Sequence, residues 1–274
     1  MKKILISLLI IYGISRFCHH QTAGFRMSKI QDNTFPVEQY VLPKIELPQK
    51  FIYLGRGLQS FSFISEDQAM VLKIFNNRYQ NRLFWLNHLP FFFQEKIALA
   101  KQKLARNFNS YKIAFEDLQT ETGLLYFHPT QTDYLHQRVI LVDNLGIEHE
   151  VNLDKTGFLL QKKAILFYPY IKHLMEQHDL EKAQKALGAF VEFLKHRYEK
   201  GIGDNDQLVR ANFGFLEEAI PMQIDVGPFY KDETLKNPDL YKNQLLESTL
   251  SLKHWLEAHY PELAIYLNEV IKSL

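Results

Sequence analysis

The segment that decides the fold covers residues 201–229 and reads GIGDNDQLVRANFGFLEEAIPMQIDVGPF. Asn212 precedes a short apolar run, and Asp225 ends a second apolar run that follows Glu217 and Glu218. Two strands joined by a turn at these glutamates would carry Asn212 and Asp225 to the same end of a hairpin. Such a pair of oxygen ligands suits Mg²⁺, which takes one or two carboxylates together with substrate phosphates. The alternative is a hairpin with Asx turns at both ends and no metal.

Residues 51–75, FIYLGRGLQSFSFISEDQAMVLKIF, predict a three-stranded meander, because runs of strand-forming residues flank a glycine pair and then a polar turn. Gly55 and Gly57 lie in the first connection, where backbone N–H groups could approach phosphate oxygens without an intervening Cβ. A hairpin turn needs glycine as well, and Ser60 stands where G-x-G-x-x-G has its third glycine. A dinucleotide-binding crossover does not fit, because a strand and not a helix follows.

Lys73 stands inside the apolar run 71–75 of the third predicted strand. A buried unpaired ammonium is costly, so we expect Lys73 to meet an anion there. The alternative is an edge strand whose lysine faces water.

The rest of the chain changes from strands to helices. Helical composition over residues 80–120 is interrupted near Pro90, where residues 91–93 form an aromatic knot. Further strands are expected at 123–128, 138–142, 148–153 and 157–167, with a turn at 144–146. A later helix has one apolar face, formed by Ala183, Leu187, Phe190, Val191 and Leu194. This order predicts a two-lobed α+β protein.

In order and spacing, these motifs resemble those of the protein-kinase-like fold. The resemblance covers residues 51–229 and consists of G-x-G-x-x-S, then V-L-K in the third strand, an Asp-containing loop, Asn212, and Asp225-Val226-Gly227 thirteen residues later in the place of D-F-G. It implies a β-rich N-lobe and a reduced helical C-lobe.

The resemblance also implies roles for single residues, with ATP and Mg²⁺ as the ligands. It implies that Gly55, Gly57 and Ser60 cover the ATP phosphates and that Lys73 contacts the α- and β-phosphates. In the family this lysine pairs with a helix glutamate, for which Glu116 is the first choice here and Glu95 the second. Asn212 and Asp225 would hold Mg²⁺.

The catalytic loop departs from the family pattern. No His-Arg-Asp is present; Ile202-Gly203-Asp204 is closer to the His-Gly-Asp of aminoglycoside-type phosphotransferases, without the histidine. The family usually has an interval of five positions between the base Asp and the metal Asn, whereas Asp204 lies eight and Asp206 six positions before Asn212. Spacing favours Asp206 as the base, and the glycine context favours Asp204, so both remain candidates.

Two functional hypotheses follow. The first is a phosphotransferase that acts with ATP and Mg²⁺ on a hydroxyl of an unknown small molecule or protein. The second is a pseudokinase scaffold that binds a protein partner or nucleotide without turnover. Retention of Lys73, Asn212 and Asp225 favours the first. The altered loop and the 47 residues after Gly227, with no Ala-Pro-Glu segment, favour the second.

The N-terminus has the pattern of an export signal. Two lysines precede an apolar run over residues 4–14, which is too short to cross a ~30 Å hydrocarbon core. We expect a signal peptide or membrane anchor at 1–20, an extended lead-in at 21–50, an N-lobe at 51–168 and a C-lobe at 169–274. The chain would be exported or membrane-associated, with its sidedness open. Cys18 stands where a lipidated cysteine would, although its neighbours Arg16 and Phe17 fit that processing badly.

Composition excludes several classes. The 274 residues are 46% apolar and 23% charged, which is typical of a folded chain with a core. A net charge of +1 provides no field that would concentrate nucleic acid. One cysteine excludes an intramolecular disulfide, and no serine-hydrolase elbow or histidine-zinc spacing is present.

Overall fold

The predicted three-stranded meander is present in the computed structural model, which describes residues 2–37, 40, 42–88 and 93–274. It consists of β1 (Lys50–Arg56), β2 (Ser60–Ser65) and β3 (Met70–Phe75), paired antiparallel. The turn before β3 is stabilised by Asp67, whose carboxylate accepts hydrogen bonds from the Ser65 hydroxyl at 2.5 Å and the Ala69 N–H at 3.0 Å.

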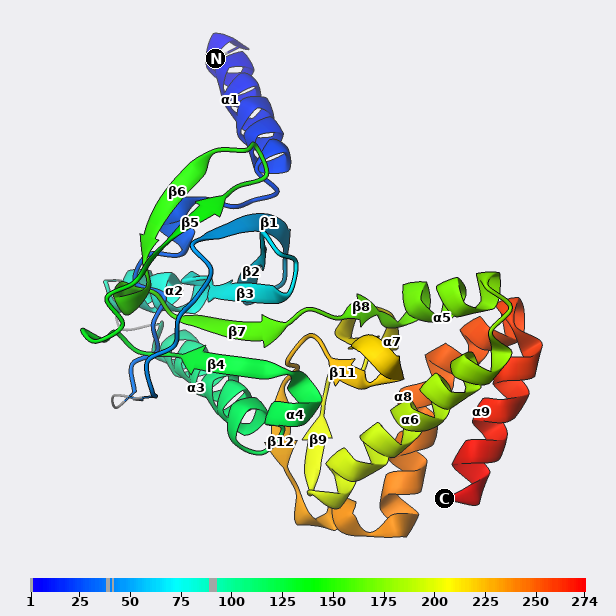
Figure 1. The fold of residues 1–274 in the computed structure, drawn as a ribbon. Coiled ribbons are helices and arrows are strands. Elements are labelled where there is room, and N and C mark those ends of the chain that lie inside the picture. Colours follow the sequence, from blue (N-terminus) through cyan, green and yellow to red (C-terminus); the bar gives the residue numbers. More distant parts are fainter. Residues whose placement is uncertain (1, 38–39, 41, 89–92) are drawn as a thin grey trace. The chain divides into compact units, whose positions relative to one another are not determined.

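The meander belongs to a seven-stranded sheet with the order β4-β7-β3-β2-β1-β5-β6 (Figure 1). The other strands are β4 (Leu124–His128), β5 (Arg138–Val142), β6 (Glu148–Asn152) and β7 (Phe158–Lys162). Strand β5 runs parallel to β1, whereas β6 and β7 pair antiparallel with their neighbours β5 and β3. Strand β3 is therefore an interior strand and not an edge.

One face of this sheet carries a hydrophobic core that includes the lead-in. Phe61, Leu72 and Ile74 are buried there with Phe25 and Ile30. The lead-in is thus not simply extended: it contains a short 3₁₀ helix, Met27–Lys29, and packs several of its apolar residues, among them Phe25 and Ile30, on the sheet. Burial of these side chains is the favourable term that orders an otherwise irregular segment.

Helices connect the strands and precede them. They are α1 (Lys2–Gln21), α2 (Arg78–Asn87), α3 (Gln94–Glu116) and α4 (Gln119–Thr122). The predicted interruption at Pro90, together with two residues of the aromatic knot, lies outside the described residues; the third, Phe93, packs on a small cluster with Leu86 and Ile97. None of the helices in the described part of the chain is both long and apolar enough to cross a membrane.

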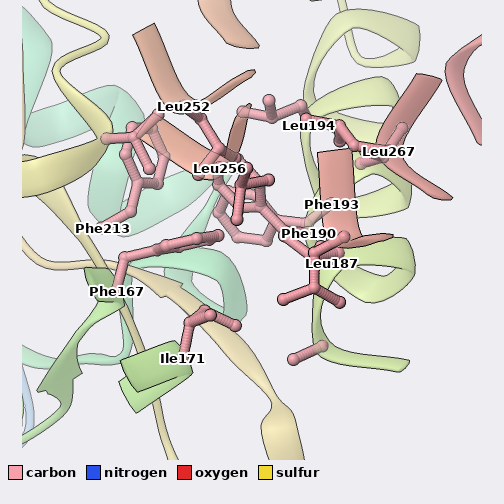
Figure 2. Close-up of a cluster of buried hydrophobic side chains, with 14 of the residues drawn as sticks. Phe167, Ile171, Leu187, Phe190, Phe193, Leu194, Phe213, Leu252, Leu256 and Leu267 are labelled. Carbon is pink, nitrogen blue, oxygen red and sulfur yellow. The ribbon is translucent and has the colours of Figure 1, made fainter. Parts of the chain in front are cut away.

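The remaining elements are mostly helical. They are α5 (Phe167–Glu176), α6 (Leu180–Glu199), α7 (Val209–Asn212), α8 (Pro238–His259) and α9 (Pro261–Ser273). All five residues of the predicted apolar face of α6 are buried in one core. Figure 2 shows Phe167 of α5, Phe190 of α6 and Leu256 of α8 meeting in this core.

Short strands lie beside these helices. β8 (Ile165–Leu166), β10 (Phe213–Phe215) and β11 (Pro221–Gln223) form one sheet, and β9 (Ile202–Asp204) pairs with β12 (Phe229–Lys231). The strand expected over 157–167 is wrong as a single element, because β7 and β8 belong to different sheets. Strand β7 ends with the polar residues Gln161 and Lys162, and polar Lys163 follows before β8 begins.

The chain divides into two compact units. We call Met1–Ala105 with Leu125–Lys162 the sheet unit, and Arg106–Leu124 with Lys163–Leu274 the helical unit. The division differs from the expected boundary at residue 168 chiefly in the end of α3. The end of α3 and the residues after it belong to the helical unit, and Lys200 is one link within that unit. Its ammonium donates to the Asp117 carbonyl at 3.0 Å and pairs with Glu121. The predicted α+β class, with a β-rich first part and a helical second part, is confirmed.

Candidate active site

The β10–β11 hairpin brings Asn212 and Asp225 to the same end, as predicted. The Asn212 carbonyl accepts hydrogen bonds from the N–H groups of Ile224, at 2.7 Å, and Asp225, at 3.3 Å. Strand pairing between Phe213 and Gln223 sets this register. The two candidate metal ligands are therefore neighbours through the backbone, although they are thirteen residues apart in sequence.

The side chains of these two residues leave oxygen atoms available. Asn212 is buried, and its amide nitrogen donates to the Asp206 carbonyl at 2.8 Å. Its Oδ1 accepts no hydrogen bond from any described residue, and the same holds for the exposed carboxylate of Asp225. Both groups can accept a cation or a donor from a ligand.

Asp206 is held near this pair by its backbone. Its carbonyl accepts the Asn212 amide, and its N–H donates to Asp204 Oδ1 at 2.8 Å. The half-buried Asp206 carboxylate accepts no hydrogen bond from the described residues. Two backbone contacts thus fix the position of a carboxylate that is itself uncommitted.

Asp204 has the opposite character. It ends β9, and its side chain is fully buried. Oδ1 accepts the Asp206 N–H, and Oδ2 accepts the Gln223 amide at 2.6 Å. Burial raises the pKa of Asp204. The charge of Arg197 and these two hydrogen bonds act in the opposite direction and reduce the increase. Both of its oxygens are thus engaged in holding the loop, whereas the Asp206 carboxylate accepts no hydrogen bond from the described residues.

Arg197 is the cation behind this loop, and sequence reasoning missed it. It is completely buried in the last turn of α6, with Nη1 3.7 Å from Asp204 Oδ2. It also donates to the side-chain oxygens of Gln223 and Gln207, each at 2.8 Å. The signal was present: Arg197 lies three positions after Leu194 and continues the buried face of α6. A charge on a buried face requires a partner.

The segment after Asp225 is anchored at Gly227. Its carbonyl accepts the Ser110 hydroxyl, which in turn accepts the Phe229 N–H at 3.0 Å. A Cβ added to Gly227 would lie 2.2 Å from Asp204 Oδ1. The backbone at Gly227 therefore approaches the buried Asp204 carboxylate too closely for a side chain. This contact explains why glycine stands at the third position of Asp-Val-Gly.

In the sheet unit, Lys73 is buried with 7% exposure on interior strand β3. Its strand neighbours are Ser62 on β2 and Leu159 on β7. The alternative of an edge strand with Lys73 facing water is wrong. Leu72 and Ile74, on either side, belong to the hydrophobic core, so alternation places Lys73 on the opposite face of the sheet.

The predicted glycine loop is a tight hairpin connection. The Gly57 N–H donates to the Ser60 carbonyl at 2.9 Å, and Gly55 still pairs with Ser62 at a β-bulge. A Cβ at Gly55 would meet nothing within 4 Å, and one at Gly57 would first meet Ser60 at 3.9 Å. The loop leaves open space above its backbone, while the Gly57 N–H is committed to the turn.

The two glutamates considered for Lys73 lie at opposite ends of α3. Glu95 is exposed in the first turn, in the sheet unit. Glu116 ends the helix, in the helical unit, and lies 4.0 Å from the Lys112 ammonium. Their assignment to Lys73 stays a prediction.

The site offers few side chains that could bind a metal ion. Within the described residues, no group of three or more His, Cys, Asp or Glu side chains is placed to hold a metal ion. Asn212 and Asp225 supply a set of ligands that consists of one amide oxygen and one carboxylate. Such a set matches a cation that takes its remaining ligands from water and substrate phosphates, as Mg²⁺ does.

Comparison with known proteins identifies no family. No family model matches the chain, and no curated protein matches it. Among solved structures, the bifunctional kinase-methyltransferase WbdD is 16% identical, with a TM-score of 0.35, covering 78% of this chain and 42% of that one. Rv3197 of Mycobacterium tuberculosis, solved in complex with erythromycin, is 11% identical, with a TM-score of 0.34, covering 90% of this chain and 57% of that one. The chain thus spans about half the length of these proteins.

Proposed function

We propose that the protein is a kinase-like phosphotransferase that uses ATP and Mg²⁺ to phosphorylate a hydroxyl of a small molecule or protein. The observation that carries the proposal is the cluster of Asp206, Asn212 and Asp225. Hydrogen bonds join the three residues through their backbones and the Asn212 amide, while acceptor oxygens of all three side chains lack donors among the described residues.

The donor set fits Mg²⁺. Asn212 Oδ1 and the Asp225 carboxylate would hold the ion, and the side-chain amide of Asn212 is already oriented by its bond to the Asp206 carbonyl. Bound Mg²⁺ would neutralise negative charge on phosphoryl oxygens.

Asp206 would serve as the base. Its carboxylate would accept the proton of the acceptor hydroxyl as that oxygen forms a bond to the γ-phosphorus and the bond from the γ-phosphorus to the bridging oxygen breaks, releasing ADP. Asp204 would act through its bond to the Asp206 N–H and so be a positioning residue. Lys73 would contribute its charge to phosphate binding in the role that the kinase resemblance implies.

A second candidate is a pseudokinase that binds nucleotide without turnover. Burial of Asp204, whose oxygens are both occupied, favours it, since the aspartate in the Gly-Asp context then has no access to a substrate. The six-residue interval from Asp206 to Asn212 also exceeds the family's usual five.

Calorimetric titration of the full chain with ATP, with and without Mg²⁺, tests the proposal. We expect binding that requires Mg²⁺ and is lost in Asp225→Ala. Asp239→Ala is the matched control, because it removes another exposed carboxylate of the helical unit, at the start of α8. Binding with no ATP turnover would favour the pseudokinase. Absence of binding at millimolar ATP would refute the phosphotransferase and favour a pseudokinase scaffold that binds a protein partner.

A further inference from the structure

A basic pocket lies in the sheet unit. Gly57 of the glycine loop lines it, but its charged residues have no role in the proposed phosphotransfer. It has a volume of about 600 Å³ and is formed by the lead-in, the β1–β2 connection and the start of α2. Its charged lining residues are Lys29, Arg56 and Arg78, and its polar ones are Asn76, Asn77 and Asn81. No carboxylate of the described residues lines it. Phe61, which also lines it, is on the core face of the sheet, opposite to Lys73.

The cations of this pocket have no acidic partners in the described part of the chain. Lys29 donates to the Gly24 carbonyl at 2.6 Å, and Arg56 Nη1 lies 3.2 Å from His19 Nε2. Burial lowers the pKa of Lys29, and the charges of Arg26 and Arg56 lower it further. Burial also lowers the pKa of His19, and the charges of Lys29, Arg56, Arg16 and Arg26 lower it further. The charges here repel one another, so an anion would relieve them.

One of these cations, Arg56, contacts His19 in the last turn of α1, and Lys29 contacts Gly24 just after the helix. This helix contains no acidic residue. The large apolar side chains that the structure describes on this helix are exposed, among them Ile4 at 67%, Leu9 at 61%, Ile11 at 62% and Phe17 at 64%. Contacts at its end tie it to the sheet unit: His19 meets Arg56, and the Gln21 carbonyl accepts the Asn144 amide at 2.8 Å. Apolar surface of this extent needs a cover.

We propose that the sheet unit docks on an anionic phospholipid surface, with α1 inserted among the acyl chains and the pocket of Lys29, Arg56 and Arg78 receiving headgroup phosphates. Charge complementarity and continuity carry the proposal, because the apolar helix leads into a cluster of cations that have no acidic partner among the described residues. A lipid surface presents hydrocarbon and phosphate in that same order. A soluble phosphate would satisfy the pocket but leave α1 uncovered. The proposal does not depend on the phosphotransferase activity.

Vesicle sedimentation with the full chain tests this docking. Vesicles containing phosphatidylglycerol should bind the protein many-fold more tightly than vesicles of phosphatidylcholine alone, and added salt should weaken the binding. The double variant Arg56→Gln/Arg78→Gln should bind about 30-fold more weakly, since each basic residue near such a surface contributes about fivefold. Lys185→Gln/Lys272→Gln is the matched control: it removes two exposed cations of the helical unit and should bind as the wild type does.

A second variant tests the helix by itself. Leu9→Asn/Ile11→Asn replaces two exposed apolar side chains of α1 and should reduce vesicle binding without changing the thermal unfolding transition, because neither residue packs on the core. Equal binding to both kinds of vesicle, or unchanged binding by the arginine double variant, would overturn the proposal. Full release of the protein from vesicles by millimolar inorganic phosphate at constant ionic strength would also overturn it, and would assign the pocket to a soluble phosphate.

Discussion

Gln223 donates a hydrogen bond to the buried carboxylate of Asp204, with 2.6 Å between Nε2 and Oδ2. Each of the two residues lies two positions before a candidate catalytic carboxylate, Asp225 in one case and Asp206 in the other. One buried bond therefore ties the strand that leads to the candidate metal ligand to the loop that carries the candidate base. Arg197 contacts both partners: its Nη1 donates to Gln223 Oε1 at 2.8 Å and lies 3.7 Å from the same Asp204 Oδ2.

Asp204 and Asp206 should differ in what their loss affects. We expect Asp206→Asn to abolish phosphoryl transfer with little change in stability, because its carboxylate makes no hydrogen bond within the described residues. Asp204→Asn should instead lower the free energy of unfolding by about 3 kcal/mol, because it leaves the buried charge of Arg197 without its counter-ion. Urea unfolding and ATP turnover, measured on both variants, separate the roles. Loss of stability in Asp206→Asn and not in Asp204→Asn would reverse the assignment.

Gly227→Ala should destabilise the helical unit by about 1 to 3 kcal/mol, because its new methyl group would lie 2.2 Å from Asp204 Oδ1. The cost should fall when Asp204 is shortened to alanine in the same chain, so a double-mutant cycle should give a clear coupling energy. Gly55→Ala serves as the control, since open space surrounds the Cβ at that position. Additive effects in the cycle would contradict the contact.

Lys73→Met should leave the fold intact and remove Mg-ATP binding. Methionine has a similar length and suits the buried interior of the sheet, so packing is largely conserved while the charge is lost. Calorimetry measures the binding, and circular dichroism checks the fold. Lys162→Met makes the same replacement at an exposed position of β7 and should bind ATP normally. Wild-type affinity in Lys73→Met would exclude this lysine from nucleotide binding.

Asp154 should contribute to stability at neutral pH but not in acid. Burial by itself would raise the pKa of this carboxyl, but hydrogen bonds from the Thr132 hydroxyl and the N–H groups of Leu135 and His136 outweigh burial and lower the pKa below 3.8. A carboxyl with a depressed pKa stabilises the fold above its unfolded pKa, and this stabilisation is lost as the pH falls through the folded value.

Asp154→Asn should therefore lower the free energy of unfolding by about 1 to 3 kcal/mol at pH 7, with a smaller difference from the wild type near pH 3. Urea unfolding at the two pH values measures both differences. Asp133→Asn, an exposed change in the same loop, should have little effect at either pH. A difference that does not shrink in acid would show that Asp154 acts through packing and not through its charge.

Much of the local structure could be predicted because local patterns encode it. The runs around Gly55 and Gly57 predict the β1–β2–β3 meander, and the spacing of Ala183, Leu187 and Phe190 predicts the buried face of α6. The hairpin that joins Asn212 to Asp225 was also predictable, because two short apolar runs flank a turn. These features depend on neighbours within a few residues, where side-chain periodicity is informative.

Only the tertiary structure decided which carboxylates and cations are buried and which partners they contact. Spacing and glycine context could not choose between Asp204 and Asp206, because burial of Asp204 depends on Arg197 and Gln223, which lie on other elements. Interior placement of Lys73 required the pairing of β3 with β7, more than eighty residues away in sequence. The sequence by itself therefore determined the elements and the candidate ligands. The partners that engage each charged group depend on long-range packing, which local patterns do not contain.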